Sequence, residues 1–325
     1  MCIRDRDQSL VAHDQTEFSA LSPYLWSPQL PEYDAFVSKQ LEVLKSAGWF
    51  NGASGVKVMA ADNVVTRRAT QQIVLPFLAN AGITNASEYY IDSSNAGTLG
   101  ATTSAALTSA RSERQDHILT IGGSRVLAVA LSTQEAQDLK SVYSVSSYDY
   151  PAFLVDNPAT IVAERRNGMA GLGFSPSLDM RINSSTEPYP DPARPTEVLC
   201  KQIIDGVGAA PPEVSRENYR VDMGYCESTL LLKAALDKAP NDITPNAFRD
   251  AVWSLGTSWS AATTYGSNWQ PGQYAGATVV RGIYWDPQCP LTNRTTAGCF
   301  RWGTSDIPLT PVTTTTPPAP AATEP

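Results

Sequence analysis

Histidine is nearly absent from this sequence, which has only His13 and His117 among its 325 residues. A Ser-His-Asp hydrolase would have to use one of these two imidazoles, and no Gly-x-Ser-x-Gly segment provides the turn that carries a nucleophilic serine. No Cys-x-x-Cys pair occurs, and both histidines lie far from the cysteines, so no zinc site is predicted. We therefore expect a protein that is not an enzyme and that holds no metal or cofactor.

Long apolar runs and long basic runs are also lacking. No segment approaches the roughly 20 consecutive apolar residues that span a bilayer, and the chain as written carries no export signal. The net charge is −8, the pI is near 4.9, and no run of Lys and Arg exceeds two residues. These features argue against nucleic acid or an anionic membrane as the partner, and a repressor core would also need a helix-turn-helix segment that we do not find.

Five cysteines are present. Cys2 lies in the stretch 1–6, which looks like a translated sequencing adapter and is left out of the predicted fold. The other four form two candidate disulfides, Cys200 with Cys226 between two predicted helices and Cys289 with Cys299 across a predicted hairpin. Each bridge would contribute on the order of 2–4 kcal/mol and would place the protein in an oxidising compartment. The alternative is four buried free thiols in a cytosolic protein.

Helical and strand patterns alternate through the first half of the chain. The predicted helices are 31–47, 66–81, 102–114, 125–139 and 157–166, and the predicted strands are 56–60, 88–91, 118–121, 142–145 and 169–174. Strands that alternate with helices form a parallel sheet with helices on both faces, which is the α/β class.

The second half is less regular. After a loop at 183–195, helices are predicted at 196–204, 219–239 and 244–253, followed by strands at 277–285 and 299–302. Residues 304–325 are dominated by Pro, Thr and Ala, so we expect them to be a disordered tail.

The stretch 116–176 carries the most informative pattern. Its strand 118–121 passes through a Gly-Gly turn into the helix 125–139 and then into the strand 142–145, which ends in Ser-Ser-Tyr-Asp-Tyr-Pro. Polar and aromatic residues thus follow both strands at their carboxyl ends, where open α/β sheets bind their ligands.

The order of these segments resembles the type I periplasmic solute-binding proteins, the branched-chain amino acid receptor family of ABC transporters. The matching segments are Ser-Pro-Tyr-Leu-Trp-Ser-Pro at 22–28, Gly-Phe-Ser-Pro at 173–176, Gly-Tyr-Cys-Glu-Ser-Thr-Leu-Leu-Leu-Lys-Ala-Ala-Leu at 224–236 and Ile-Tyr-Trp-Asp at 283–286. The resemblance implies two doubly wound parallel-sheet lobes, the first incomplete in this sequence. It implies the end of lobe 1 and the first crossing at 7–28, lobe 2 at 29–172, the returning part of lobe 1 at 173–278, and a closing disulfide hairpin at 279–303.

The resemblance also implies a ligand that is captured between the lobes as they close about a hinge. The candidate contacts on lobe 2 follow its strands and are Asp62, Asn63, Ser124, Arg125, Tyr148 and Asp149. In amino acid-binding relatives a carboxylate near the position of Asp149 meets the ammonium group of the ligand. Arg125 stands where an aromatic side chain is common, and it would favour a carboxylate-bearing ligand.

Each candidate contact has a structural alternative. Asp149 and Ser124 are natural helix caps, and Arg125 would then lie on a solvated helix start. Asp62 with Asn63 is typical of a turn after a strand, and Tyr148 of core packing.

The resemblance implies an extracytoplasmic protein that delivers an amino acid or carboxylate-bearing solute to an ABC permease. The export signal and much of lobe 1 would then lie upstream of this sequence. A ligand-sensing receptor domain for a signalling partner is the main alternative, and a serine hydrolase is less favoured.

Overall fold

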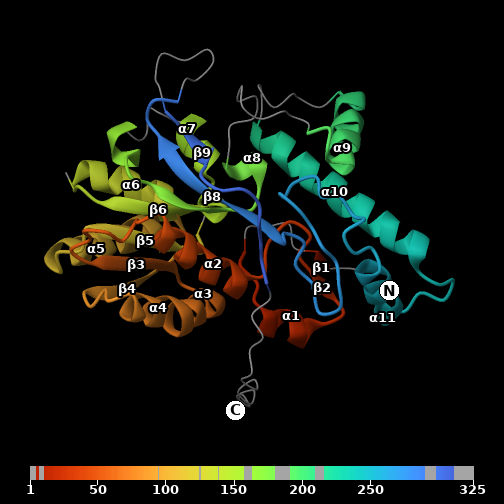
Figure 1. Cartoon of the computed structure of the whole chain (residues 1–325), viewed down its shortest axis with the longest axis horizontal. Helices are drawn as coiled ribbons and strands as arrows, with labels where there is room; N and C mark the ends of the chain where they lie inside the picture. Colours follow the sequence, from red (N-terminus) through yellow and green to blue (C-terminus); the bar gives the residue numbers. More distant parts are fainter. Residues whose placement is uncertain are drawn as a thin grey trace.

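The structure is a computed structural model that describes residues 5–6, 11–93, 95–123, 126–137, 139–156, 163–179, 191–208, 216–289 and 298–310. The chain folds into an α/β part, on the left of Figure 1, and a mostly helical part, on the right. None of the described helices combines the length and the apolar character that a membrane span needs.

The α/β part is built on an eight-stranded sheet with the order β10-β8-β7-β6-β5-β3-β4, and β9 also pairs with β8. The strands are β3 (Val56–Ala61), β4 (Ala86–Ile91), β5 (His117–Ile121), β6 (Val142–Ser146), β7 (Ala170–Gly173), β8 (Val279–Asp286), β9 (Cys299–Trp302) and β10 (Ile307–Pro308). Strands β3 to β7 are parallel, which confirms the predicted parallel sheet. Strand β8 is antiparallel to β7, β9 and β10, and β8 with β9 forms the predicted hairpin.

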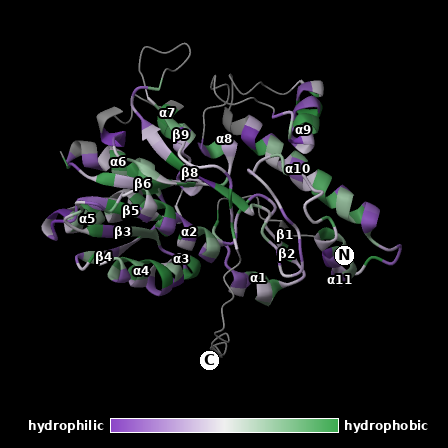
Figure 2. Ribbon diagram, viewed as in Figure 1, coloured by the Kyte–Doolittle hydropathy of each residue, from purple (hydrophilic) through white to green (hydrophobic). Residues whose placement is uncertain are grey.

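Helices cover both faces of the sheet, as predicted. One face carries α2 (Tyr33–Ser46), α3 (Val64–Ala69) and α4 (Leu75–Asn80), and the other carries α5 (Ala96–Ser112), α6 (Val126–Ala136) and α7 (Pro151–Asp156). Successive side chains of a strand point to opposite faces, so Val58 of β3 packs in the first core and Met59 in the second. Figure 2 shows β3, β5 and β6 mostly in hydrophobic colours, whereas the covering helices mix both kinds of residue.

Several elements differ from the predicted ones. The predicted helix 66–81 is interrupted by a π-helical turn at Thr70–Val74 (η1), because Pro76 in the first turn of α4 has no N–H and its ring would collide with the carbonyl four residues earlier. Helix α7 was not predicted. Most of the predicted helix 157–166 lies outside the described residues, and Ala163–Arg166 form a 3-10 helix.

The helical part contains α1 (Gln15–Leu21), α9 (Pro195–Gly206), α10 (Arg216–Lys238) and α11 (Pro245–Trp253). Its two strands, β1 (Asp5–Arg6) and β2 (Leu25–Trp26), pair in parallel, although residues 1–6 were left out of the predicted fold. Its core is rich in aromatic residues, which include Phe18, Trp26, Phe248, Trp269 and Tyr274. Within the described residues this part has no larger sheet.

Three segments join the two parts: the first connection (22–31), the second connection (173–179) and the third connection (261–278). Backbone hydrogen bonds join the first connection to the third. Gly276 N donates to Ser27 O at 2.7 Å, and Ala277 N donates to Leu30 O at 3.1 Å. The second and third also run side by side, with Tyr265 N donating to Phe174 O at 3.2 Å. The junction is therefore a hydrogen-bonded bundle of three chain segments.

Both predicted disulfides form. Cys200 of α9 is bonded to Cys226 of α10 with their Cα atoms 5.7 Å apart, and Cys289 is bonded to Cys299 with Cα atoms 5.5 Å apart. The first fastens two neighbouring helices and the second closes the β8–β9 hairpin, as expected from the sequence.

Residues 304–325 were predicted to form a disordered tail, and this prediction is wrong for the first residues of that range. Strand β10 pairs with Val279 and Val280 of β8. Ile307 and Leu309 pack against the first core of the α/β part, so this short apolar segment has a buried surface to hold it. Residues 311–325 lie outside the described part of the chain.

Candidate functional site

The carboxyl ends of β3, β5 and β6 meet at one edge of the sheet, because these strands are parallel neighbours. The start of α2 lies at the same edge: the ring of Tyr33 is 5.4 Å from that of Tyr148, which follows β6. Gly122 follows β5 with φ +70°, and a Cβ there would lie 2.9 Å from the Tyr33 hydroxyl and would overlap Thr66. Glycine thus lets β5 end directly against α2 and α3.

The segment that leads into α1 crosses this edge. The carbonyl of His13 accepts a hydrogen bond from Tyr33 N at 3.0 Å, and Gln15 N donates to Glu32 Oε1 at 3.1 Å. Glu32 also caps α2 by accepting from two backbone N–H groups of its first turn, at 3.1 and 2.8 Å. Burial, and then the charge of Asp34, raises the pKa of Glu32 to about 7. The helical part therefore reaches the strand ends through buried polar contacts.

An ion-pair cluster lies beside these contacts. We call Asp14, Asp34 and Arg68 the Arg68 cluster. Arg68 Nη2 lies 2.6 Å from Asp14 Oδ2 and 2.6 Å from Asp34 Oδ1, and both carboxylates are buried. Burial raises the pKa of Asp34 in spite of the guanidinium. One guanidinium is therefore shared by two buried carboxylates.

Asp62 and Asn63, which follow β3, are exposed. The Asp62 carboxylate accepts two hydrogen bonds from Arg67, at 2.5 and 2.8 Å, and these lower the pKa of Asp62. Asn63 caps α3 by accepting from Thr66 N at 3.0 Å. The turn interpretation is thus confirmed for this pair, and ligand contact stays a prediction.

Tyr148 and Asp149, which follow β6, are buried. The Tyr148 ring lies 5.0 Å from that of Phe174, as expected for core packing. Asp149 Oδ2 accepts from Ser146 N and Oγ, both at 2.8 Å, and from Thr120 Oγ1 at 3.2 Å. Burial raises the pKa of Asp149 to about 7 against the effect of these donors. Asp149 is thus not the cap of the helix that follows it: it stands third in a capping box whose N-cap is Ser146. Ligand contact stays a prediction for both residues.

The last two candidate contacts, Ser124 and Arg125, lie outside the described residues. The structure brings Tyr148 and Asp149 together after β6, and it places Asp62 and Asn63 on the exposed turn after β3. The sequence analysis missed the Arg68 cluster, because Arg68 lies within a predicted helix. The one local signal of a charged cluster was the pair of acidic residues, Glu32 and Asp34, on either side of Tyr33 at the start of the first predicted helix.

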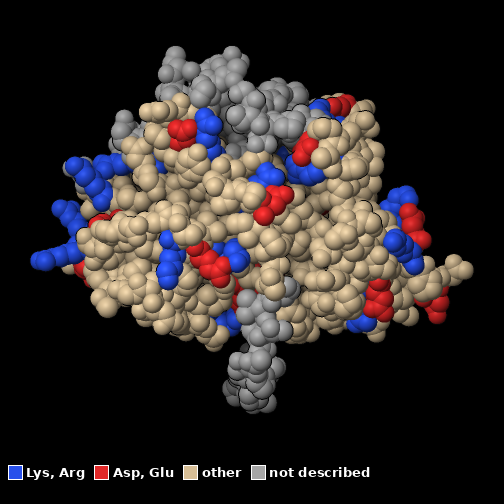
Figure 3. All heavy atoms as spheres, in the orientation of Figure 1, with Lys and Arg blue, Asp and Glu red and all other residues tan. Residues whose placement is uncertain are grey.

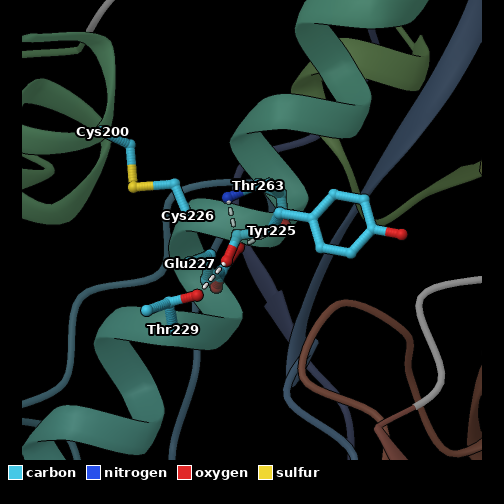
Figure 4. Close-up of a disulfide and its surroundings, with 6 residues drawn as sticks. All are labelled: Cys200, Tyr225, Cys226, Glu227, Thr229 and Thr263. Carbon is cyan, nitrogen blue, oxygen red and sulfur yellow. Dashed lines mark hydrogen bonds between the residues drawn. A yellow bond between two sulfur atoms is a disulfide. The ribbon is translucent and has the colours of Figure 1, made fainter. Parts of the chain in front are cut away.

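The interior of the helical part also holds a buried carboxyl group, that of Glu227, beside the Cys200–Cys226 disulfide (Figure 4). Glu227 of α10 accepts from Thr263 N at 2.9 Å and also from the Thr263 hydroxyl. Burial raises the pKa of Glu227 to about 7. This contact fixes α10 to the third connection.

A groove of about 490 Å³ lies between α9 and α10. Its apolar lining includes Ile203, Val207 and Leu230, with Tyr225 exposed at its rim. Figure 4 shows the Tyr225 ring pointing away from the disulfide and from Glu227. All lining residues belong to these two helices and their ends, so the groove is separate from the strand-end site.

On the face drawn in Figure 3, basic and acidic side chains are interspersed and form no continuous basic patch. No group of three or more His, Cys, Asp or Glu side chains in the described ranges could hold a metal ion.

Comparison with known proteins gives a result only at the level of structure. No family model and no curated protein matches the sequence. A branched-chain amino acid ABC transporter protein from Thermus thermophilus with bound valine is similar over 89% of this chain and 70% of its own, with 14% identity and a TM-score of 0.58. A fatty acid ABC transporter substrate-binding protein from Thermomonospora curvata is similar over 91% of this chain and 67% of its own, with 14% identity and a TM-score of 0.58. A leucine-binding protein from Thermotoga maritima is similar over 86% and 67%, with 11% identity and a TM-score of 0.54.

Proposed function

We propose that this chain, which has the fold of type I periplasmic binding proteins, captures a small polar solute between its two parts and delivers it to an ABC permease. The observation that supports this most directly is the structural likeness to solute-binding proteins over about nine-tenths of the chain. One of these neighbours holds valine and another is described as a fatty acid-binding protein, so the fold admits solutes of different classes.

The solute site we propose lies at the strand ends of the α/β part. Its candidate contacts are Asp62, Asn63, Ser124, Arg125, Tyr148 and Asp149, with the Arg68 cluster as an addition from the structure. These groups combine carboxylates with guanidinium groups, which suits an amino acid or another carboxylate-bearing solute. Closure of the helical part over this edge would bury the solute.

Solute binding accounts for the placement of His117 better than a hydrolase does. His117 opens β5, so it lies at the opposite end of that strand from the edge where β6 ends in Ser146. It bonds to Asp116 at 2.8 Å, and its ring packs against Trp49 with centroids 4.8 Å apart. An Asp-His pair at the amino end of the sheet cannot activate a serine at the carboxyl end.

The two disulfides support an extracytoplasmic location, because such bonds persist in oxidising compartments. This part of the proposal predicts that the purified chain contains no more than one free thiol, that of Cys2, when it is denatured without reductant and titrated.

Thermal unfolding in the presence of candidate solutes tests the proposal. The chain should be stabilised by at least one member of a panel of amino acids and small carboxylates, by about 2.7 kcal/mol when the solute is at 100 times its Kd. Asp62→Asn and Asp149→Asn should reduce this stabilisation. Asp237→Asn is the matched control, because Asp237 pairs with Lys233 on the solvent-exposed side of α10. If no solute of the panel stabilises the chain, the proposed function is contradicted.

A further inference from the structure

An aromatic ring of the α/β part and a guanidinium group of the helical part meet beside the strand-end site. Tyr150 follows β6, and its ring packs partly against the first core. Arg220 lies in the second turn of α10, and its Cζ atom is 5.7 Å from the centroid of the Tyr150 ring. Both side chains are half-buried. Helix α10 therefore reaches the residues after β6 directly, and not only through the connections.

The backbone of Tyr150 has a conformation that aromatic residues rarely adopt. Its φ is 53° and its ψ is 65°, which is the left-handed region that suits glycine, asparagine and aspartate. Tyr150 N donates to Ser147 O at 3.1 Å and so closes the turn after β6. The turn alone does not require a tyrosine, so the ring must contribute something that offsets the strain. Residues strained in this way cluster at ligand-binding and catalytic sites.

Arg220 shares one face of α10 with two residues that seat the helix on the connections. Arg220, Gly224 and Glu227 are spaced four and three residues apart, so their positions line up along the helix. A Cβ at Gly224 would lie 2.6 Å from Nε2 of Gln29 in the first connection. Glu227 accepts from Thr263 N of the third connection at 2.9 Å. These contacts fix the height at which Arg220 meets the strand ends.

The arginines differ in what they contact at this edge. Arg67 and Arg68 of α3 both pair with carboxylates of the chain itself. Arg220 instead lies beside a ring. A planar guanidinium can contact an aromatic ring and still donate two parallel hydrogen bonds from its edge to a carboxylate.

We propose that Arg220 and Tyr150 are further contacts of the solute site, in which Arg220 binds a carboxylate of the solute and the Tyr150 ring positions the guanidinium. This inference rests on the proposed function and assigns recognition of the solute's carboxylate to two residues outside the candidate contacts above. Arg220 belongs to the helical part and Tyr150 to the α/β part. A solute held by this pair would therefore be bound from both parts at once.

Titration calorimetry of the 325-residue chain with matched pairs of solutes tests the assignment. The pairs are L-valine with L-valinamide, butyrate with butyramide, and succinate with succinamide, so that each amide lacks the carboxylate of its partner. At least one carboxylate should bind the unmodified chain, with a Kd roughly tenfold or more below that of its amide, because the amide loses hydrogen bonds that involve two charged groups. Equal binding of acid and amide overturns the inference.

Substitutions of Arg220 measure its share of that preference. Arg220→Gln should raise the Kd of the carboxylate roughly tenfold or more and leave that of the amide nearly unchanged. Arg220→Lys keeps the charge without the planar fork, so its Kd should lie between the two. Lys233→Gln is the matched control, because it removes a cation from the solvent-exposed side of the same helix. A carboxylate that binds Arg220→Gln as tightly as the unmodified chain contradicts the proposal.

Substitutions of Tyr150 separate a binding role from a structural one. Tyr150→Phe keeps the ring, so the Kd of the carboxylate should stay the same. Tyr150→Asn removes the ring but suits the left-handed backbone, so that Kd should rise roughly two- to fivefold while the urea midpoint changes little. A lower urea midpoint with an unchanged Kd would show that the ring serves only to pack, and would overturn its assignment.

Failure of this inference and failure of the proposed function give different results. If uncharged solutes stabilise the chain in the thermal screen and none of the three carboxylates binds, solute capture stands and the role of Arg220 falls. The same holds if a carboxylate binds and Arg220→Gln does not weaken it. If no solute of any class binds, both proposals fall.

Discussion

The Cα atom of Gly173 packs directly against the carboxylate of Asp179, and a Cβ at residue 173 would overlap that carboxylate. Gly173 is the last residue of β7 and Asp179 the last residue of α8 (Pro176–Asp179), so this contact closes the turn from the sheet into the second connection. The hydroxyls of Ser147 and Tyr265 hold the carboxylate in place from two sides. The turn therefore has no room for a side chain at residue 173.

Gly173→Ala should destabilise the chain by about 1–3 kcal/mol, because the added methyl group must displace a buried, hydrogen-bonded side chain. Urea unfolding of both proteins gives the difference. Gly100→Ala is the control: residue 100 lies within α5 with no heavy atom within 4 Å of the added Cβ, and alanine there should stabilise the helix by up to about 1 kcal/mol. A neutral or stabilising effect of Gly173→Ala would show that the carboxylate moves without cost.

The free energy of unfolding should fall as pH rises from about 5 to 8. Burial raises the pKa of several carboxyl groups to about 7, namely Glu32, Asp149, Asp179, Glu197 and Glu227. Such a group binds its proton more tightly in the folded than in the unfolded chain, so its contribution is largest near pH 4 and is lost as pH rises through 7. Glu113 has the opposite sign, because hydrogen bonds from Ser109 and Ser87 lower its pKa to about 2, but its contribution is lost only below about pH 4.5.

Urea midpoints at pH 5 and pH 8 measure this dependence. Glu227→Gln should reduce the difference between the two midpoints, because glutamine still accepts from Thr263 but cannot ionise. A midpoint at pH 8 equal to or above that at pH 5 would mean that water reaches these carboxyl groups in the folded chain.

Much of the α/β part follows from local pattern. Strands β3 and β5 were predicted to within one residue because each is a short apolar run between helical stripes, and their parallel order follows from the βαβ connection. The π-helical turn and α7 each depend on how the backbone adjusts beside a proline, Pro76 and Pro151 respectively. Hydrophobic periodicity does not detect such an adjustment. The place of β10 depends on Ile307 and Leu309 finding an apolar face that is distant in sequence.

The strand-end site was less accessible to sequence reasoning. The residues that follow each strand could be named, because parallel strands present their carboxyl ends at one edge. The Arg68 cluster could not, since Asp14 and Arg68 are 54 positions apart and meet only after the segment before α1 crosses that edge. A carboxylate within reach of a distant guanidinium has no local signature.

The two disulfides should differ in their contribution to stability. The chain-entropy treatment gives about 3.5 kcal/mol for the loop closed by Cys200–Cys226 and about 2.7 kcal/mol for that closed by Cys289–Cys299, because their sequence separations are 26 and 10 residues. Urea unfolding of the two double Cys→Ala variants tests this order. A larger loss for the Cys289–Cys299 pair would show that the hairpin itself depends on its bond.

Two adjacent arginines on α3 should respond differently to the same substitution. Arg68 pairs with the buried carboxylates of Asp14 and Asp34, whereas Arg67 pairs with exposed Asp62. Arg68→Gln should lower the free energy of unfolding by about 3–5 kcal/mol, because it leaves two buried carboxylates without a cation. Arg67→Gln should leave the free energy of unfolding nearly unchanged, because water screens an exposed pair.

The loss in Arg68→Gln should also depend on pH. Without the guanidinium, the ionised and buried carboxylate of Asp34, whose pKa burial already raises, is uncompensated, so the loss should be larger at pH 8 than at pH 5, where protonation of Asp34 relieves it. Adding Asp34→Asn should restore part of the stability at pH 8, since one of the two carboxylates is then removed. If both arginine variants unfold at the same urea concentration as the unmodified chain, the Arg68 cluster does not fasten the segment before α1 to the strand ends.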